Sequence, residues 1–246
     1  MFRIERKDRT ASTNQDMENL IRQAMANGKD ITEYQTIIAD FQDSGRGQKG
    51  NFWHSAAGQN LLASICFHPP VSAARQFVFN EYFALAVRQV LADIIGEVKI
   101  KWPNDIYVGD KKIAGILIEH AIVGDAIRYT IAGLGLNLNE TDFPAALPNP
   151  VSLSQITGKQ YDILEFTDKI LTSCQRFSSL LKPENRAALE TEFLSHLYRI
   201  NEWASFEIGG QCVEARITGV DAFGRLLLEG RAGEQWCCGM KEVRFR

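Results

Sequence analysis

Residues 98–136 contain four strand patterns in succession with no helical pattern between them, and this order limits the folds open to the chain. The patterns cover residues 98–102, 106–109, 111–123 and 126–136, separated by the turn signals PND, GDK and GD. Parallel neighbours would need a crossover of roughly a dozen residues, which these turns do not provide. The stretch therefore predicts antiparallel hairpins rather than alternating βαβ units.

Helical patterns precede this region. Residues 12–28 place apolar side chains at helical spacing, with Thr13 as the predicted cap and Gly28 as the end of the helix. A longer helix is predicted from about Ser72 to Ile95, because Gly96 follows it directly. Its buried face is predicted to consist of Val87, Val90, Leu91 and Ile94.

Further elements follow the same rules. Residues 35–42 and 60–67 are short apolar runs that predict strands, and residues 163–181 and 183–198 predict two helices. Together the patterns predict an α+β fold with a mixed, largely antiparallel sheet and helices.

The C-terminal segment differs from the rest of the chain. From Ser205 onward it contains short strands separated by glycine turns, which predicts a small SH3-like β-barrel beside a larger domain. A chain of 246 residues can bury one sizeable core and carry such a module. We therefore expect a main domain over residues 1–200 and a small β-barrel domain over residues 201–246.

The composition excludes several classes of protein. With 45% hydrophobic residues, 23% charged residues and a net charge of −3, the chain has too little positive charge for a nucleic-acid surface. No stretch could span a bilayer, and the N-terminal residues MFRIERKDRT lack the apolar core of a signal peptide. The five cysteines and four histidines lack zinc or disulfide spacing. We expect a cytoplasmic protein with no DNA partner and no membrane partner.

Residues 44–53, SGRGQKGNFW, contain the pattern G-x-G-x-x-G. A dinucleotide fingerprint needs a helix directly after the glycines, whereas this loop joins two predicted strands. A kinase glycine loop is excluded because the other kinase motifs are absent. Two readings remain: an anion-binding loop with the cations Arg46 and Lys49, or a surface hairpin with solvated charges.

Three later residues also suggest a ligand site. Lys112 begins a predicted strand, and Gly115 lies within that strand, where it weakens the strand unless a ligand or another backbone comes close. Asn137 follows the glycine-rich strand GLGL and could contact a purine edge. The alternatives are a solvated lysine beside Asp110 and an asparagine in a turn.

These stretches together resemble a known family. STN, FQDSGRGQKGNFW, KWPNDIYVGDKKIAGILIE and GLGLNLN, in this order, resemble the catalytic domain of biotin protein ligases. The matching runs extend from Ser12 to Asn139, and the C-terminal segment resembles the small C-terminal domain of the family. The resemblance implies a monofunctional biotin–[acetyl-CoA-carboxylase] ligase without an N-terminal DNA-binding domain, since eleven residues precede Ser12.

The resemblance also implies an activity and its site residues. Biotin and ATP, with Mg²⁺ carried on the nucleotide, would form biotinyl-5′-AMP, and a lysine of biotin carboxyl carrier protein would then take the biotin. Lys112, Arg46 and Asp105 would be catalytic. The biotin-binding residues would be Ser12, Thr13, Asn14, Gln42, Gly45, Arg46, Lys112 and Gly115, and the adenylate-binding residues Arg46, Trp53, Asn104, Lys112 and Asn137.

One position departs from the family pattern, and alternatives remain open. Gln48 stands where many members have an arginine that helps retain the adenylate. The alternatives are a lipoate or octanoate ligase, whose R-R-x-S-G-G-G type loop is absent, and a non-catalytic regulator that binds biotin or a nucleotide. Exposed strand edges favour a homodimer and docking of the carrier.

Overall fold

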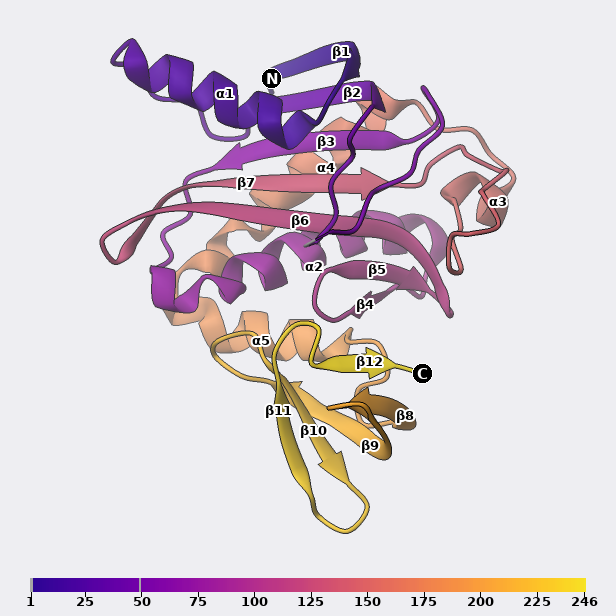
Figure 1. Ribbon diagram of the computed structural model, residues 1–246. Coiled ribbons are helices and arrows are strands. Elements are labelled where there is room, and N and C mark those ends of the chain that lie inside the picture. Colours follow the sequence, from indigo (N-terminus) through magenta and orange to yellow (C-terminus); the bar gives the residue numbers. More distant parts are fainter. Residues whose placement is uncertain (1, 49) are drawn as a thin grey trace.

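The computed structural model describes residues 2–48 and 50–246, and its larger part is built on a seven-stranded sheet (Figure 1). The strand order is β1-β2-β3-β7-β6-β5-β4. β1 and β2 are parallel, and every other neighbouring pair is antiparallel. The expected mixed, largely antiparallel sheet is therefore confirmed. The strands are β1 (Ile4–Thr10), β2 (Thr36–Gln42), β3 (Leu61–Phe67), β4 (Lys99–Lys101), β5 (Asp105–Val108), β6 (Lys111–Val123) and β7 (Ala126–Leu136).

Helices lie on both faces of this sheet. In Figure 1, α1 lies in front of the sheet, and α2 and α4 lie behind it. The core behind the sheet is rich in aromatic side chains, and the cluster under α1 is much smaller. No helix in the described residues is long and apolar enough to cross a membrane. The helices are α1 (Thr13–Ala26), α2 (Phe77–Ile95), α3 (Leu153–Thr157), α4 (Ile163–Phe177) and α5 (Arg186–Ser195), with 3-10 turns at Ala73–Arg75, Ser178–Leu181 and Pro183–Asn185.

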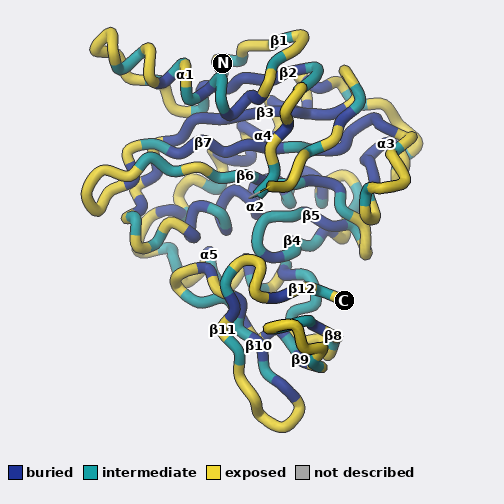
Figure 2. The backbone as a smooth tube through the Cα atoms, viewed as in Figure 1, coloured by how far each residue is buried: buried dark blue, intermediate teal, exposed yellow. Residues whose placement is uncertain are grey.

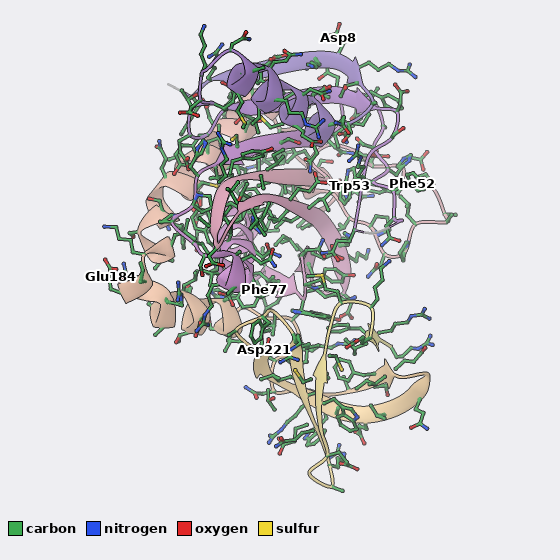
Figure 3. The ribbon with its side chains drawn as sticks, turned by 60° about the vertical axis from the view of Figure 1, so that its left-hand side comes forward. Asp8, Phe52, Trp53, Phe77, Glu184 and Asp221 are labelled. Atoms are coloured by element: carbon green, nitrogen blue, oxygen red, sulfur yellow. The ribbon has the colours of Figure 1, made fainter. Side chains whose placement is uncertain are left out.

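A second sheet forms the C-terminal part of the molecule. Its five strands are antiparallel in the order β11-β10-β9-β8-β12. Figure 3 shows Phe77, at the start of α2, close to the loop of this sheet that carries Asp221. The Trp102 indole Nε1 donates to the Gly224 carbonyl at 2.9 Å, which joins the two parts of the chain. The strands are β8 (Trp203–Ile208), β9 (Gln211–Val220), β10 (Leu226–Gly230), β11 (Gln235–Cys238) and β12 (Val243–Phe245).

Most predicted elements are present, and their ends differ by a few residues. The long helix begins at Phe77 rather than near Ser72, because a 3-10 turn precedes it. The predicted domain boundary at residues 200 and 201 lies just before β8 and stays a prediction. The neighbouring residues Cys237 and Cys238 lie on opposite faces of β11, since Cys237 is exposed whereas Cys238 is buried.

Two local predictions were wrong. Ser12, not Thr13, occupies the N-cap of α1, because the Thr13 hydroxyl contacts side chains of the sheet. Ile94 is 38% exposed and does not belong to the buried face of α2. Two elements, β1 and α3, were not predicted at all.

Candidate functional site

Three glycines keep part of the front face of the sheet free of side chains. Gly115 of β6 and Gly135 of β7 are partners in the ladder, and Gly133 lies two residues before Gly135. A Cβ atom on Gly135 would overlap the Trp53 indole, and one on Gly115 would lie 2.9 Å from that ring. A Cβ atom on Gly133 would lie 2.5 Å from Asn14 Oδ1. The glycines therefore make room for Trp53 and Asn14.

The glycine loop crosses this face and folds back on itself. The Trp53 N–H donates to the Gly45 carbonyl at 3.0 Å, and Arg46 pairs with Phe52 as an isolated β-bridge. Figure 3 shows Trp53 nearer to the sheet and Phe52 farther out, where it is 83% exposed. Lys49, the second predicted cation, lies outside the described residues.

A buried carboxylate fixes the return of the loop to the sheet. Glu140 accepts hydrogen bonds from the Ala56 N–H at 3.1 Å and from Asn60 Nδ2 at 2.5 Å. Its other oxygen lies 3.2 Å from His54 Nε2. Since these partners directly follow Trp53, Glu140 limits where the indole can lie.

The first cavity lies between the loop and the glycines and has a volume of about 130 Å³. The start of α1, the end of β2, the loop, the turn before β5, and strands β6 and β7 all contribute to its wall. Figure 2 shows buried strands beneath this region and an exposed loop over it. Ten of the twelve predicted site residues line the cavity: Ser12, Thr13, Asn14, Gln42, Arg46, Trp53, Asn104, Asp105, Lys112 and Gly115.

One end of the cavity is polar and buried. The Thr13 N–H donates to Gln42 Oε1 at 2.8 Å, and Thr13 Oγ1 lies 3.1 Å from the same atom. Ser64 Oγ lies 2.7 Å from Thr13 Oγ1 and 2.5 Å from Asn14 Oδ1. Asn14 Nδ2 donates to Glu119 Oε2 at 2.6 Å. These contacts join α1, β2, β3 and β6 around the polar end.

The other end is charged. The Lys112 ammonium lies 2.7 Å from Asp105 Oδ1 and 5.6 Å from the centre of the Trp53 ring. The side chains of Lys112 and Asp105 are 30% and 23% exposed, so a ligand can reach both. The Asn104 amide donates to the Ile116 carbonyl, which fixes the turn before Asp105. Arg46 lines the same cavity and donates to Gln15 Oε1 of α1 at 2.6 Å.

A second cavity of about 430 Å³ adjoins the first. Lys112 and Trp53 line both cavities, and Asn137 lines the second. Asn137 is 4% exposed and donates through Nδ2 to the Val151 carbonyl at 3.1 Å, which leaves its amide oxygen for a ligand. The remaining wall is largely apolar and consists of Gly50, Asn51, Phe52, His54, Phe143, Leu147, Pro148 and Pro150.

The structure thus brings eleven of the predicted residues to the walls of two adjoining cavities. The twelfth residue, Gly45, lines neither cavity, but its carbonyl accepts the hydrogen bond from the Trp53 N–H. Sequence reasoning missed Ser64, Glu119 and Glu140, because each matters only through partners far away in the sequence. It also missed the wall of the second cavity, although the apolar, proline-rich run FPAALPNP at residues 143–150 was a usable signal.

Within residues 2–48 and 50–246, no group of three or more His, Cys, Asp or Glu side chains could hold a metal ion. Asp105 is the one carboxylate among the described residues that line the first cavity. A divalent cation at this site would therefore take most of its oxygen ligands from a substrate.

Comparison with known proteins identifies the family. The model of the biotin/lipoate A/B protein ligase family matches residues 7–137. The bifunctional ligase/repressor BirA of Bacillus subtilis is 36% identical over 130 residues, which are 51% of this chain and 40% of that protein. The biotin–[acetyl-CoA-carboxylase] ligase of Paracoccus denitrificans is 30% identical over 206 residues, 81% of this chain and 85% of the relative.

Solved structures agree on the fold. The biotin protein ligase from Aquifex aeolicus in complex with biotin and ATP superimposes with a TM-score of 0.81. The superposition covers 100% of this chain and 99% of that one, at 22% sequence identity. Two BirA proteins of Bacillus are only partly covered by this chain: the matched part spans 40% of the length of one and 62% of the length of the other. The chain belongs to the biotin/lipoate A/B protein ligase family.

Proposed function

We propose that this protein is a biotin protein ligase that activates biotin with ATP and transfers it to a lysine of a carrier protein. The observation that carries the proposal is that Lys112 and Trp53 line both cavities. Two substrates held in adjoining cavities would bring their reacting groups together beside the Lys112 ammonium. The Paracoccus relative is named a biotin–[acetyl-CoA-carboxylase] ligase, and the Aquifex protein was solved with biotin and ATP, both in agreement with this assignment.

Biotin fits the first cavity with its ureido ring at the polar end. Ser12, Thr13 and Gln42 offer hydrogen-bonding groups there, and all three line the wall. The valeryl chain would extend along the cavity wall beside Trp53, which brings the carboxylate to the charged end. Gly45 and Arg46 belong to the loop that would cover the bound ligand.

ATP fits the second cavity. Its apolar wall suits an adenine ring, and the free amide oxygen of Asn137 can accept from the exocyclic amine of adenine. Lys112 lies between this cavity and the first, where the α-phosphate must lie for the carboxylate to reach it.

The first step joins two anions. Bringing a carboxylate oxygen to within about 4 Å of a phosphate costs on the order of 4 kcal/mol at an effective dielectric near 20. The Lys112 and Arg46 cations offset this repulsion and stabilise charge on the phosphorus centre as pyrophosphate leaves. Mg²⁺ bound to the phosphate oxygens would neutralise further charge. Asp105 and the Asn104 side-chain oxygen are the protein groups that would contact it.

The second step transfers the biotinyl group. The amine of the carrier lysine attacks the acyl carbon, the C–N bond forms, and AMP leaves with the bonding electrons of the C–O bond. The amine loses a proton in this step, and Asp105 can accept it once Lys112 has turned to the adenylate. Catalysis then rests on orientation and charge stabilisation, with no covalent bond to the enzyme.

The carrier and a second copy of this chain would use strand edges. β1 and β4 are the outer strands of the large sheet, and outer strands present unpaired N–H and C=O groups. We infer that the carrier is a biotin carboxyl carrier protein in the cytoplasm and that the ligase forms a homodimer. Sedimentation of the protein with and without biotin and ATP measures the dimer directly.

The direct test is a labelling assay. The protein is incubated with ATP, Mg²⁺, labelled biotin and a purified carrier domain, and the label on the carrier is measured. Lys112→Ala should lower the rate of adenylate formation by about 10²- to 10³-fold, because it removes the cation between the two substrates. Lys111→Ala is the matched control, since Lys111 is adjacent in β6 but exposed, and it should keep the wild-type rate.

Two results would contradict the proposal. If the carrier stays unlabelled, or if lipoate is transferred in preference to biotin, the assignment of biotin as the substrate is wrong. A normal rate of adenylate formation in Lys112→Ala would show that the charge role belongs to another residue.

A further inference from the structure

Glu119 of β6 is outside the cavity wall, yet it ends a continuous chain of polar contacts that reaches the polar end. The chain runs from Glu119 to Asn14, Ser64, Thr13 and Gln42, with separations of 2.6, 2.5, 2.7 and 3.1 Å. Asn14, Ser64 and Thr13 are buried, at 4%, 0% and 3% exposure. These three side chains are therefore shielded from bulk water, and their polar groups find most of their partners within the protein.

The two ends of the chain determine the direction of most hydrogen bonds in it. A carboxylate only accepts, so the Asn14 amide must point Nδ2 at Glu119 and Oδ1 at Ser64. Ser64 has one hydroxyl hydrogen, and it must therefore go to Asn14 Oδ1. At the other end a backbone N–H only donates, so Gln42 must point Oε1 at the Thr13 N–H.

The Thr13 hydroxyl hydrogen has two acceptors within reach, Ser64 Oγ at 2.7 Å and Gln42 Oε1 at 3.1 Å. Because Ser64 gives its own hydrogen to Asn14, the Thr13 hydrogen is used in one of these two contacts and is not available to a ligand. The lone pairs of Thr13 Oγ1 and the Nε2 donor of Gln42 are left for the cavity.

We propose that Glu119 is a positioning residue that, through Asn14 and Ser64, holds the Thr13 hydroxyl as a hydrogen-bond acceptor for the ureido ring of biotin, beside the Gln42 donor that the Thr13 N–H orients. This inference rests on the proposed function. A cyclic urea carries N–H donors and a carbonyl acceptor. Thr13 Oγ1 therefore accepts a hydrogen bond from a ureido N–H, and Gln42 Nε2 donates one to the ureido carbonyl. A dithiolane ring or an alkyl chain offers neither group, so the same chain of contacts favours biotin over lipoate and octanoate.

The position of Asn14 in this chain also depends on the sheet. Asn14 lies over Gly133, and Gly133 is the ladder partner of Ser64 in β3 and of Leu117 in β6. Glu119 is two residues beyond Leu117, so its side chain projects from the same face of β6. The sheet order β3-β7-β6 therefore places Ser64 and Glu119 on either side of Asn14.

The experiment measures binding of biotin and of ATP by calorimetry. Glu119→Met removes the acceptor at similar length, and the affinity for biotin should fall roughly tenfold. The affinity for ATP should not change, because Glu119 lines neither cavity, and the melting temperature should fall by a few degrees at most, because Asn14 Nδ2 loses its acceptor. Glu119→Gln keeps an acceptor oxygen, and its affinity for biotin should stay within about threefold of wild type.

Two comparisons separate positioning from a general structural role. Glu5→Met replaces another exposed strand glutamate, one that pairs with Lys7 on β1, and it should leave biotin binding unchanged. Desthiobiotin keeps the ureido ring but lacks the thioether, so Glu119→Met should weaken its binding by the same factor as for biotin. In turnover, the KM for biotin should rise while kcat and the KM for ATP stay constant.

Several outcomes overturn the inference. Glu119→Met with wild-type affinity for biotin rules out the positioning role, and equal losses in Glu119→Met and Glu119→Gln rule out the acceptor as its basis. A loss for biotin without a loss for desthiobiotin places the effect at the thioether. A wild-type protein that does not bind biotin refutes the proposed function instead.

Discussion

The two faces of the seven-stranded sheet are built in opposite ways. Behind the sheet, Phe67 of β3 packs against Phe79, Tyr82 and Phe83 of α2, with ring centres 5.1 to 6.2 Å apart. On the front, Cys66 lies in the small cluster under α1, and beyond that cluster glycines replace side chains. Successive residues of one strand therefore belong to a densely packed core and to the front face that carries the cavity.

This difference separates stability from chemistry. The rear face supplies apolar burial, which stabilises the sheet and fixes its strands. The front face gives up that burial at Gly115 and Gly135, and the space holds Trp53 and the cavity. Substitutions on the two faces should consequently change different measured quantities.

The largest effect is expected for Phe67→Ala. Phe67 is 2% exposed, and removing its ring leaves a cavity among four other aromatic rings, those of Tyr34, Phe79, Tyr82 and Phe83. The free energy of unfolding should fall by about 3–5 kcal/mol. Urea unfolding followed by circular dichroism measures this loss, and the activity per folded molecule should remain that of wild type.

Cys66→Ala is the control on the opposite face. It removes one sulfur atom from a small cluster, so the loss should be about 1 kcal/mol. If both substitutions cost the same, the rear face would not be the main source of stability.

A smaller effect, on binding, is expected for Gly135→Ala. The new methyl group would overlap the Trp53 indole and push the ring away from the sheet. Overpacking of this kind costs about 1–3 kcal/mol, so biotin affinity should fall roughly 10- to 100-fold while the unfolding midpoint changes little. Calorimetry with biotin measures the first quantity and thermal unfolding the second.

Gly219→Ala is the matched control, since Gly219 is a strand glycine of β9 with its nearest neighbour atom at 3.8 Å. It should bind biotin as wild type does. Unchanged binding in Gly135→Ala would mean that Trp53 need not lie on the sheet for biotin to enter.

The sequence allowed the elements with strong local patterns to be predicted. Strands β6 and β7 alternate and end at short turns, so their pairing followed from sequence spacing alone. β1 has the sequence IERKDRT, whose charged side chains are solvated or paired with β2 and α1. It forms because it pairs in parallel with β2, and no local sequence pattern predicts this contact.

The site divides in the same way. Lys112, Gly115 and Asn137 stand out locally, and the family resemblance added Ser12 and Gln42. The contacts of Glu119 with Asn14 and of Ser64 with Thr13 join residues more than 50 positions apart. Their roles depend on the order of strands in the sheet, and the sequence does not state that order.

The packed side of the molecule has one exception, and it predicts a dependence of stability on pH. Glu81 of α2 is 6% exposed, and its Oε2 has no hydrogen-bond partner among the described residues. Burial, and secondarily the charge of Glu190, raise the pKa of Glu81 from 4.5 to about 8, although Arg186 and Arg75 oppose the shift. Between these two pH values the folded protein holds a proton that the unfolded chain has released.

Stability should therefore fall as the pH rises from about 4.5 to about 8, and this contribution should be constant above that range. The glutamine of Glu81→Gln cannot ionise, so the unfolding free energy of this variant should lack the decline. Between pH 6 and pH 9 the wild-type protein should therefore lose more unfolding free energy than the variant does. The expected difference is on the order of 2 kcal/mol. Urea unfolding of both proteins at several pH values measures it, and parallel profiles would mean that Glu81 is ionised in the folded state. Biotin affinity should be equal in the two proteins, because Glu81 belongs to the packed side and lines neither cavity.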